Sequence, residues 1–369
     1  MDAVFLRKAL VRGLGLFAAV TLLFALVPSG LGRLSLYNRV FPGRARFPYG
    51  ENPAQSYNLS IFDLDAMFAS HVINAEPKPA DEYRVVLVGD SALWGWLLRP
   101  QETLPGQLDA AGLTACDGRT VRVYNLGYPT ISLTKDLLIL DQAMRYQPDL
   151  VIWLVTLESF PADKQLTPPL VANNAARVDD LIARYSLPLD PASPDLVRPT
   201  FWERTLVGQR RPLADLLWLQ LYGVLWSATG VDQFYPASYD RAQTDFDTDV
   251  SFHGMQPPML DESSLAFPVL EAGLRAVGGT PVILVNEPIL VSSGKNSDLR
   301  YNFYSPRWAY DQYRQMLADK AAAGGWNYLD LWDLVPAGEF TNIPFHMTAK
   351  GESLLAARLQ AAIQQQTCP

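Results

Sequence analysis

Apolar and polar positions follow two different patterns along the chain between residues 84 and 363. Short apolar runs rich in β-branched residues are separated by longer segments in which apolar residues recur every three or four positions. The short runs are typical of buried parallel strands, and the longer segments are typical of amphipathic helices. We expect strands at 84–89, 121–127, 148–156, 280–288 and 327–334, and helices at 104–113, 133–146, 310–325 and 348–363.

This alternation predicts an α/β fold in which one parallel sheet is covered by helices on both faces. Ligands of such sheets gather at the carboxyl ends of the strands. Ser91, Gly127 and Glu158 each follow a predicted strand, so we expect them at that edge. His346 lies between the last strand and the last helix, in a loop that should open at the same edge.

The N-terminal part of the chain has a different character. The segment from Gly13 to Gly32 is uncharged and long enough to cross a bilayer as a helix of about 20 residues. A cleaved signal peptide is the alternative, but no A-x-A cleavage site follows the apolar segment. Basic residues flank it on both sides, so the charge distribution does not decide its orientation.

The chain is therefore expected to have three parts. Pro- and Gly-containing irregular sequence follows the apolar segment and is typical of a stem or linker, with a short helix near residues 57–73. We expect a cytoplasmic tip and transmembrane anchor at 1–32, a stem at 33–80, and an α/β domain at 81–369 with a helical insertion at about 160–267.

The insertion interrupts the alternation of strands and helices. Helices are expected at 176–190 and 210–230, joined by Pro-rich loops. The uncharged part of the second helix is too short to span a bilayer. Three interpretations of this helix are open: it packs on the core, it covers a site as a lid, or it lies on a membrane or a membrane partner. Its aromatic residues stand behind a basic pair: Trp218, Tyr222 and Trp226 behind Arg210 and Arg211.

Composition narrows the classes of function. The 369 residues carry a net charge of -8, which argues against a nucleic-acid-binding protein because no basic patch dominates. The two cysteines, Cys116 and Cys368, lack metal-type spacing. The sequence leaves open whether they form a disulfide. This cysteine spacing leads us to expect no metal site. We also expect no nucleotide cofactor, since no glycine-rich loop of the phosphate-binding type is present, and no other cofactor.

Ser91 ends the stretch VVLVGDS at residues 85–91. A serine at such a strand-to-helix turn either caps the helix or acts as a nucleophile. A nucleophilic serine needs a base, which is most often histidine. Of the three histidines, His71 lies in the expected stem and His253 in the insertion. Only His346 is expected beside Ser91.

Four stretches in this order resemble the sequence blocks of SGNH (GDSL-type) hydrolases: VVLVGDSALWGW, VYNLGYPT, PDLVIWLVTLES and NIPFHMTAKG. The resemblance covers about residues 83–363, outside the insertion. It implies a three-layer flavodoxin-like fold and ester chemistry, with Ser91 as nucleophile and His346 as base. The family includes relatives that transfer acyl groups to cell-surface glycans, several of them anchored by one N-terminal span.

The resemblance also implies an oxyanion-binding group, where this chain departs from the family. The backbone N–H of Ser91 would contribute, and Gly127 matches the second block. Thr130 stands where the family has a second glycine, but it keeps the backbone N–H. Glu158 stands where the family has an asparagine donor. A carboxylate cannot donate a hydrogen bond unless it is protonated, and burial would favour protonation.

A second departure concerns the residue that orients the histidine. The family's aspartate lies three residues before the histidine, where this chain has Ile343. Asn342 is the nearest polar residue and is our candidate for the orienting role. Asp330 and Asp333, from the preceding strand, would take that role only if the fold brings them close.

The leading hypothesis is a membrane-anchored SGNH-fold esterase or O-acyltransferase. It would act on acyl esters of an extracytoplasmic glycan or lipid. Its candidate protein partner is an integral-membrane acyltransferase or another member of a membrane complex. The alternative is an inactive SGNH-fold subunit that binds or assembles a membrane complex. The distance between Ser91 Oγ and His346 Nε2 separates the two hypotheses, because catalysis requires a hydrogen bond there.

Overall fold

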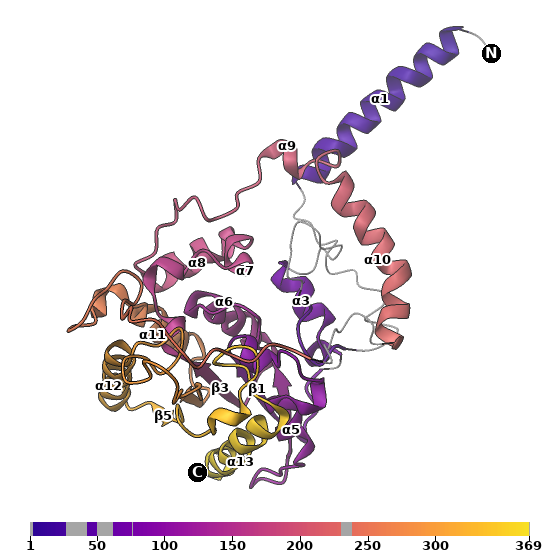
Figure 1. The fold of residues 1–369 in the computed structure, drawn as a ribbon. Coiled ribbons are helices and arrows are strands. Elements are labelled where there is room, and N and C mark those ends of the chain that lie inside the picture. The colour runs from indigo at the N-terminus through magenta and orange to yellow at the C-terminus, as the bar shows by residue number, and fades with distance from the viewer. Residues whose placement is uncertain (1–2, 27–42, 50–61, 76, 230–237, 369) are drawn as a thin grey trace.

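A parallel sheet lies at the centre of the molecule (Figure 1). The computed structural model describes residues 3–26, 43–49, 62–75, 77–229 and 238–368. Within them, five strands are arranged in the order β2-β1-β3-β4-β5, which is the flavodoxin-like order of doubly wound sheets. The strands are β1 Glu82–Val88, β2 Thr120–Asn125, β3 Leu150–Val155, β4 Val282–Asn286 and β5 Asn327–Asp330.

The register aligns the ends of the three strands that matter most for the site. Leu87 of β1 pairs with Asn125 of β2, and Val88 pairs with Trp153 of β3. All these pairings are parallel, so the loops that follow β1, β2 and β3 leave the sheet at one edge. The residues after these strands therefore approach each other although they are distant in sequence.

Alternate residues of the strands supply two hydrophobic cores, one on each face of the sheet. Val86 and Val88 of β1 belong to one core, and Val85 and Leu87 belong to the other. The first core includes side chains of α6 Leu133–Ala143, α11 Phe267–Ala276 and α12 Arg307–Gly324, and the second includes those of α5 Leu104–Ala110 and α13 Ala349–Thr367. The predicted three-layer α/β fold is confirmed.

Local signals account for the ends of the long helices. The helix α12 ends at Gly325, whose φ of 63° is left-handed and suits glycine. The helix α13 begins after Thr348, whose side chain accepts a hydrogen bond from the Gly351 N–H. The short helices α3 Leu64–Ser70 and α4 Ser91–Trp94 precede β2. The insertion contains α7 Pro169–Ala172, α8 Ala175–Tyr185, α9 Phe201–Arg204 and α10 Arg210–Thr229.

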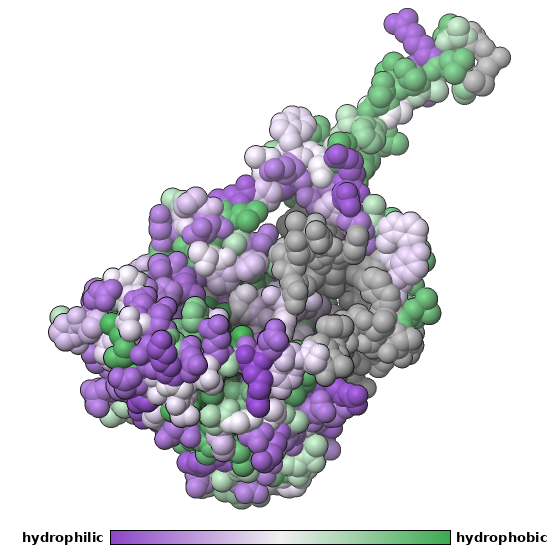
Figure 2. Space-filling view, in the orientation of Figure 1, coloured by the Kyte–Doolittle hydropathy of each residue, from purple (hydrophilic) through white to green (hydrophobic). Residues whose placement is uncertain are grey.

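The N-terminal helix α1 spans Ala3–Leu26 and projects from the body of the molecule (Figure 1). Among the described residues it is the one helix long and apolar enough to cross a membrane, and its surface is largely hydrophobic (Figure 2). The helix begins earlier than the predicted span 13–32, because the preceding residues also favour helix. Residues 27–32 lie outside the described residues.

Part of the expected stem packs into the first core. Phe47, Met67 and Phe68 are buried there, and the short helix expected in this region is α3. Residues 33–42 and 50–61 of the expected stem lie outside the described residues. The insertion also contributes to this core, through Val178 and Leu181 of α8. The exact division of the chain into domains stays a prediction.

Cys116 and Cys368 form a disulfide, with Cα atoms 5.2 Å apart. The bond joins the loop between α5 and β2 to the end of α13, across 252 residues of sequence. It therefore fastens the C-terminal helix to the layer that α5 and α13 form.

We expect the double substitution Cys116→Ser with Cys368→Ser to destabilise the protein. A bond that closes so long a loop restricts the unfolded chain, and such bonds stabilise proteins by about 2–5 kcal/mol. Urea unfolding followed by circular dichroism should show a lower midpoint, and reduction of the wild type should reproduce it. An unchanged midpoint in both experiments would contradict the prediction.

Candidate active site

Ser91 is the first residue of α4, directly beyond the carboxyl end of β1. Its predecessor Asp90 is the N-cap, and the Asp90 Oδ1 accepts a 2.7 Å hydrogen bond from the Ala92 N–H. The Ser91 side chain is half-buried, so its hydroxyl can be reached. The turn ends at Gly95, whose φ is 88°. A Cβ there would lie 2.1 Å from the Thr103 methyl group, so glycine is required.

Two polar side chains hold the backbone of this turn. The Arg46 guanidinium donates to the carbonyls of Gly95 (2.8 Å) and Leu98 (3.1 Å), and it lies 3.9 Å from the centre of the Trp94 ring. The Asn125 side-chain amide, at the end of β2, donates to the Leu93 carbonyl at 3.1 Å. The serine is thus fixed from both the predicted stem and the neighbouring strand.

His346 reaches Ser91 across the edge of the sheet. Its Nε2 lies 2.8 Å from Ser91 Oγ, and its Nδ1 lies 2.8 Å from Asn342 Oδ1. Burial lowers the pKa of His346 to about 3, so the ring is neutral at neutral pH. Because Nδ1–H donates to Asn342, Nε2 presents its lone pair to the serine hydroxyl. This is the arrangement of nucleophile, base and orienting group that acyl transfer needs.

The alternative orienting groups lie elsewhere. Asp330 accepts hydrogen bonds from Asn286 (2.9 Å) and Arg314 (2.7 Å), and Asp333 is not in contact with the histidine. Ile343 packs against the first core. Of the candidates from the sequence, the structure brings only Asn342 to the histidine.

Trp96 forms an aromatic wall of the site. Its ring is nearly parallel to the His346 ring, with centroids 5.9 Å apart and an interplanar angle of 19°. Trp96 also contacts Trp94 and Tyr49. Sequence reasoning gave Trp96 no role. The available signal was a second tryptophan close behind the candidate nucleophile, which neither a strand nor a helix pattern explains.

Two of the backbone N–H groups that the sequence offers for an oxyanion make no hydrogen bond within the described residues. Among the described residues, the N–H groups of Ser91 and Thr130 have no hydrogen-bond acceptor. The Gly127 N–H donates instead to Asn125 Oδ1 at 3.0 Å. Gly127 has a spatial role, since a Cβ there would lie 2.6 Å from the Trp94 backbone nitrogen.

Glu158 lies in a single turn of 3-10 helix directly after β3. It is buried, and its Oε2 accepts a 2.6 Å hydrogen bond from Lys164 Nζ and lies 3.4 Å from His253 Nε2. Burial alone raises the pKa of the Glu158 carboxyl, but the His253 hydrogen bond and the Lys164 charge outweigh it, and the pKa lies below its usual value. Of the two states that the sequence left open for Glu158, this lowered pKa favours the ionised carboxylate.

His253 comes from the predicted insertion. It lies at the tip of a tight turn between Phe252 and Met255, where His253 and Gly254 have φ values of 47° and 77°. Two left-handed residues in succession form a type I′ hairpin turn, an uncommon conformation for histidine. The turn directs the imidazole to Glu158 and to Asp163, 3.3 Å from Nδ1. Sequence reasoning missed this contact, although a His-Gly turn was visible.

Comparison with known proteins gives distant similarities to solved structures. No family model and no curated protein sequence matches the chain. Est24, a carbohydrate acetylesterase from Sinorhizobium meliloti, is 13% identical, with coverage of 76% of this chain and 97% of that chain and a TM-score of 0.35. The M. smegmatis aryl esterase is 14% identical, with coverage of 77% and 99% and a TM-score of 0.34.

A lipolytic protein of the G-D-S-L family from Veillonella parvula DSM 2008 is 12% identical, with coverage of 76% and 96% and a TM-score of 0.33. These values are too low to assign an activity to this chain. The chain's own strand order, β2-β1-β3-β4-β5, makes its fold flavodoxin-like. On this fold Ser91 lies beyond β1, and His346 lies before the last helix.

Two charge differences set this site apart from the SGNH pattern that the sequence resembles. A neutral Asn342 stands behind the histidine, and an ionised Glu158 stands where the pattern has an asparagine donor. The first leaves a protonated His346 without a carboxylate partner. The second places negative charge, balanced by Lys164 and His253, at the position of a neutral donor.

Asn342→Asp should raise the pKa of His346 by about 1 to 3, because a carboxylate at hydrogen-bond distance favours the imidazolium. The more basic ring should also accept the serine proton more readily. NMR titration of the imidazole measures the pKa, and Asn342→Ala is the control that removes the orienting group without adding charge. If the His346 pKa stays in place in the Asn342→Asp variant, this account of the site is contradicted.

Glu158→Gln should lower the pKa of His253. In the wild type the hydrogen bond and charge of Glu158 raise it above 6.5. The contribution of His253 to stability is therefore fully present below pH 6.5 and is lost as pH rises through the folded pKa. The Glu158 carboxylate contributes to stability above pH 4.5, and this contribution is lost as pH falls through its folded pKa.

The measurement is NMR titration of His253, with thermal unfolding against pH as a second readout. Asp163→Asn is the matched control, because Asp163 is the more exposed partner of the same ring. It should change the His253 pKa less than Glu158→Gln does. The reverse order would show that Glu158 does not dominate the environment of His253.

Proposed function

We propose that the chain is a membrane-anchored esterase or O-acyltransferase that uses Ser91 as nucleophile and His346 as base. The observation that carries this proposal is the 2.8 Å contact between Ser91 Oγ and His346 Nε2, with Asn342 on the other ring nitrogen. A serine that merely caps a helix needs no neutral histidine at its hydroxyl. Here Asp90 supplies the cap, which leaves the Ser91 hydroxyl available for chemistry.

The reaction follows from this geometry. Ser91 Oγ attacks the acyl carbonyl carbon while its proton moves to His346 Nε2, and the carbonyl oxygen becomes an oxyanion. The C–O bond to the alcohol breaks, and His346 returns the proton to the leaving oxygen. Water or a second hydroxyl then attacks the acyl-serine and gives its proton to His346. The bond between the acyl carbon and Ser91 Oγ breaks, His346 returns the proton to Oγ, and the acid or the new ester leaves.

The oxyanion would accept hydrogen bonds from the backbone N–H groups of Ser91 and Thr130. Glu158 cannot supply the third donor because it is ionised. Loss of one such donor costs about 10²–10³ in rate. Lys164 Nζ, which is already hydrogen-bonded to Glu158, is the cationic donor in this region and offsets the negative charge. We therefore expect a slow enzyme rather than an inactive one.

The proposed class of substrate depends on where in the cell the catalytic domain lies. The disulfide between Cys116 and Cys368 favours an oxidising compartment. Together with the apolar helix α1, this supports a catalytic domain outside the cytoplasm, held at the membrane. Acyl esters of a glycan or lipid are substrates within its reach, and an integral-membrane acyltransferase is the partner that would supply the acyl group.

The second candidate function is an inactive subunit that uses the SGNH fold for binding. Two observations favour it: the neutral Asn342 behind His346, and the ionised Glu158 where the pattern that the sequence resembles has an asparagine donor. Both reduce stabilisation of the charges that develop during acyl transfer. Neither removes the nucleophile or its base.

We expect a fluorophosphonate probe to label Ser91. His346→Ala should slow labelling about 10²–10⁴-fold, the usual contribution of a general base, and Ser91→Ala should abolish it. Labelling is followed by gel fluorescence, and the modified peptide is identified by mass spectrometry. Ser353→Ala, on the exposed surface of α13, is the matched control and should label like the wild type. Equal, weak labelling of wild type and Ser91→Ala would favour the binding subunit.

A further inference from the structure

Helix α10 presents apolar side chains to the outside of the molecule. Leu217, Trp218 and Leu221 are 68%, 54% and 67% exposed, respectively. Leu221 lies four residues after Leu217 and three after Trp218, so the three side chains share one face of the helix. The α/β body buries its large apolar residues in two cores, and a contiguous exposed apolar row is therefore informative.

This helix begins where α1 meets the body. The base of α1 contacts α9, and Thr21 of α1 lines one recess with Trp202, Val207 and Arg210. Figure 1 shows α1 projecting from this corner and α10 running from it along the outer edge of the molecule. Hydrophobic atoms cover α1 and recur along that outer edge in Figure 2. The apolar surfaces of α1 and α10 thus both begin near α9.

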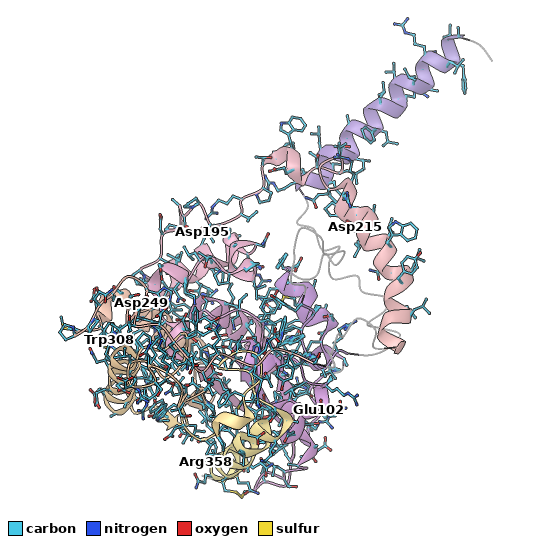
Figure 3. All side chains as sticks on the ribbon, in the orientation of Figure 1. Glu102, Asp195, Asp215, Asp249, Trp308 and Arg358 are labelled. Atoms are coloured by element: carbon cyan, nitrogen blue, oxygen red, sulfur yellow. A yellow bond between two sulfur atoms is a disulfide. The ribbon has the colours of Figure 1, made fainter. Side chains whose placement is uncertain are left out.

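The residues where α1, α9 and α10 meet are of the types found at membrane interfaces. Trp202 on α9 is 70% exposed, and tryptophan is enriched at the level of lipid headgroups. Arg210 and Arg211 open α10, and the side chain of Arg211 is 81% exposed. Asp215, labelled in Figure 3, lies 3.8 Å from Arg211 and is far less exposed. The exposed charge at the start of α10 is therefore basic, which suits anionic lipid headgroups.

We propose that α10 lies on the surface of the lipid bilayer that α1 enters, with Leu217, Trp218 and Leu221 at the boundary between headgroups and acyl chains. The inference rests on the proposed membrane anchoring by α1. The uncharged part of α10 is too short to span the bilayer, so the helix lies in the interface, at a depth of about 5–10 Å.

This contact gives the body a second point of attachment. A domain tethered by α1 alone would rotate about the tether. A domain held by both α1 and α10 keeps a fixed orientation, and the edge of the sheet that carries Ser91 then keeps a constant distance from the bilayer. Such an orientation suits esters carried by membrane-bound molecules.

The experiment uses the full chain in vesicles of phosphatidylcholine and phosphatidylglycerol. Leu221→Cys is labelled with the environment-sensitive dye NBD, and quenching by doxyl-labelled lipids is measured. Among the described residues the native cysteines are paired, so the label is specific. Leu354→Cys is the matched control, because Leu354 is an exposed leucine on α13. Phe17→Cys on α1 reports the anchor itself.

The expected result is strong lipid quenching at positions 17 and 221 and little at position 354. Trp218→Phe, without any label, should remove part of the intrinsic fluorescence that brominated lipids quench. If position 17 is quenched while 221 behaves like 354, the face lies in water and the proposal fails. Energy transfer between copies labelled at 221, without lipid quenching, would assign the face to a second copy and also overturn it.

Failure of the anchor is distinguishable from failure of the α10 contact. An unquenched label at position 17 would overturn both the membrane anchoring and this inference. Probe labelling of Ser91 in the same samples tests the catalytic proposal separately. An enzyme that labels at Ser91 while position 221 stays in water would retain the proposed function without the second membrane contact.

Discussion

The central position of β1 in the parallel sheet is the constraint on which the rest of the structure depends. All residues from Glu82 to Val88 are buried, and the strand pairs with β2 on one side and β3 on the other. One set of alternate side chains packs under α6 and the other under α5 and α13. A strand held in this way cannot shift its register without exposing both sets of apolar residues. Ser91, directly beyond it, therefore has a fixed position.

The electrostatics of the site depend on which groups stay neutral when buried. Burial keeps His346 uncharged, so it can accept a proton from Ser91, but a neutral Asn342 does little to stabilise the imidazolium that results. Glu158 is buried as well, yet Lys164 and His253 keep it ionised. The site thus combines a serine–histidine hydrogen bond with weak stabilisation of charge, and the proposed ester hydrolase or acyltransferase would therefore be slow.

The insertion has two roles in this arrangement. One turn of it delivers His253 to Glu158 at the edge of the sheet, while α10 lies at the periphery beside the base of α1. The first role links the insertion to the chemistry, and the second links it to the proposed membrane surface. Loops outside the regular strands and helices often carry such functions, because a rigid scaffold positions them while their own sequences can vary.

Periodicity and local signals in the sequence determined the strands, the long helices, and the edge at which Ser91 and His346 meet. A buried strand gives an apolar pattern of period two or an unbroken apolar run. Parallel strands end at the same edge of the sheet, so the sequence alone predicts the strands and that edge. The resemblance to SGNH blocks added Asn342 as the nearest polar group to the histidine.

Only the tertiary structure decided the contacts between side chains that are distant in sequence. It selected Asn342 over Asp330, paired Cys116 with Cys368, and stacked Trp96 on His346. It also brought His253 to Glu158, which helps to hold the pKa of that carboxyl below its usual value. Local patterns carry no information about these pairs. A pKa or a hydrogen bond depends on distances of a few ångströms, and folding alone sets these distances between residues far apart along the chain.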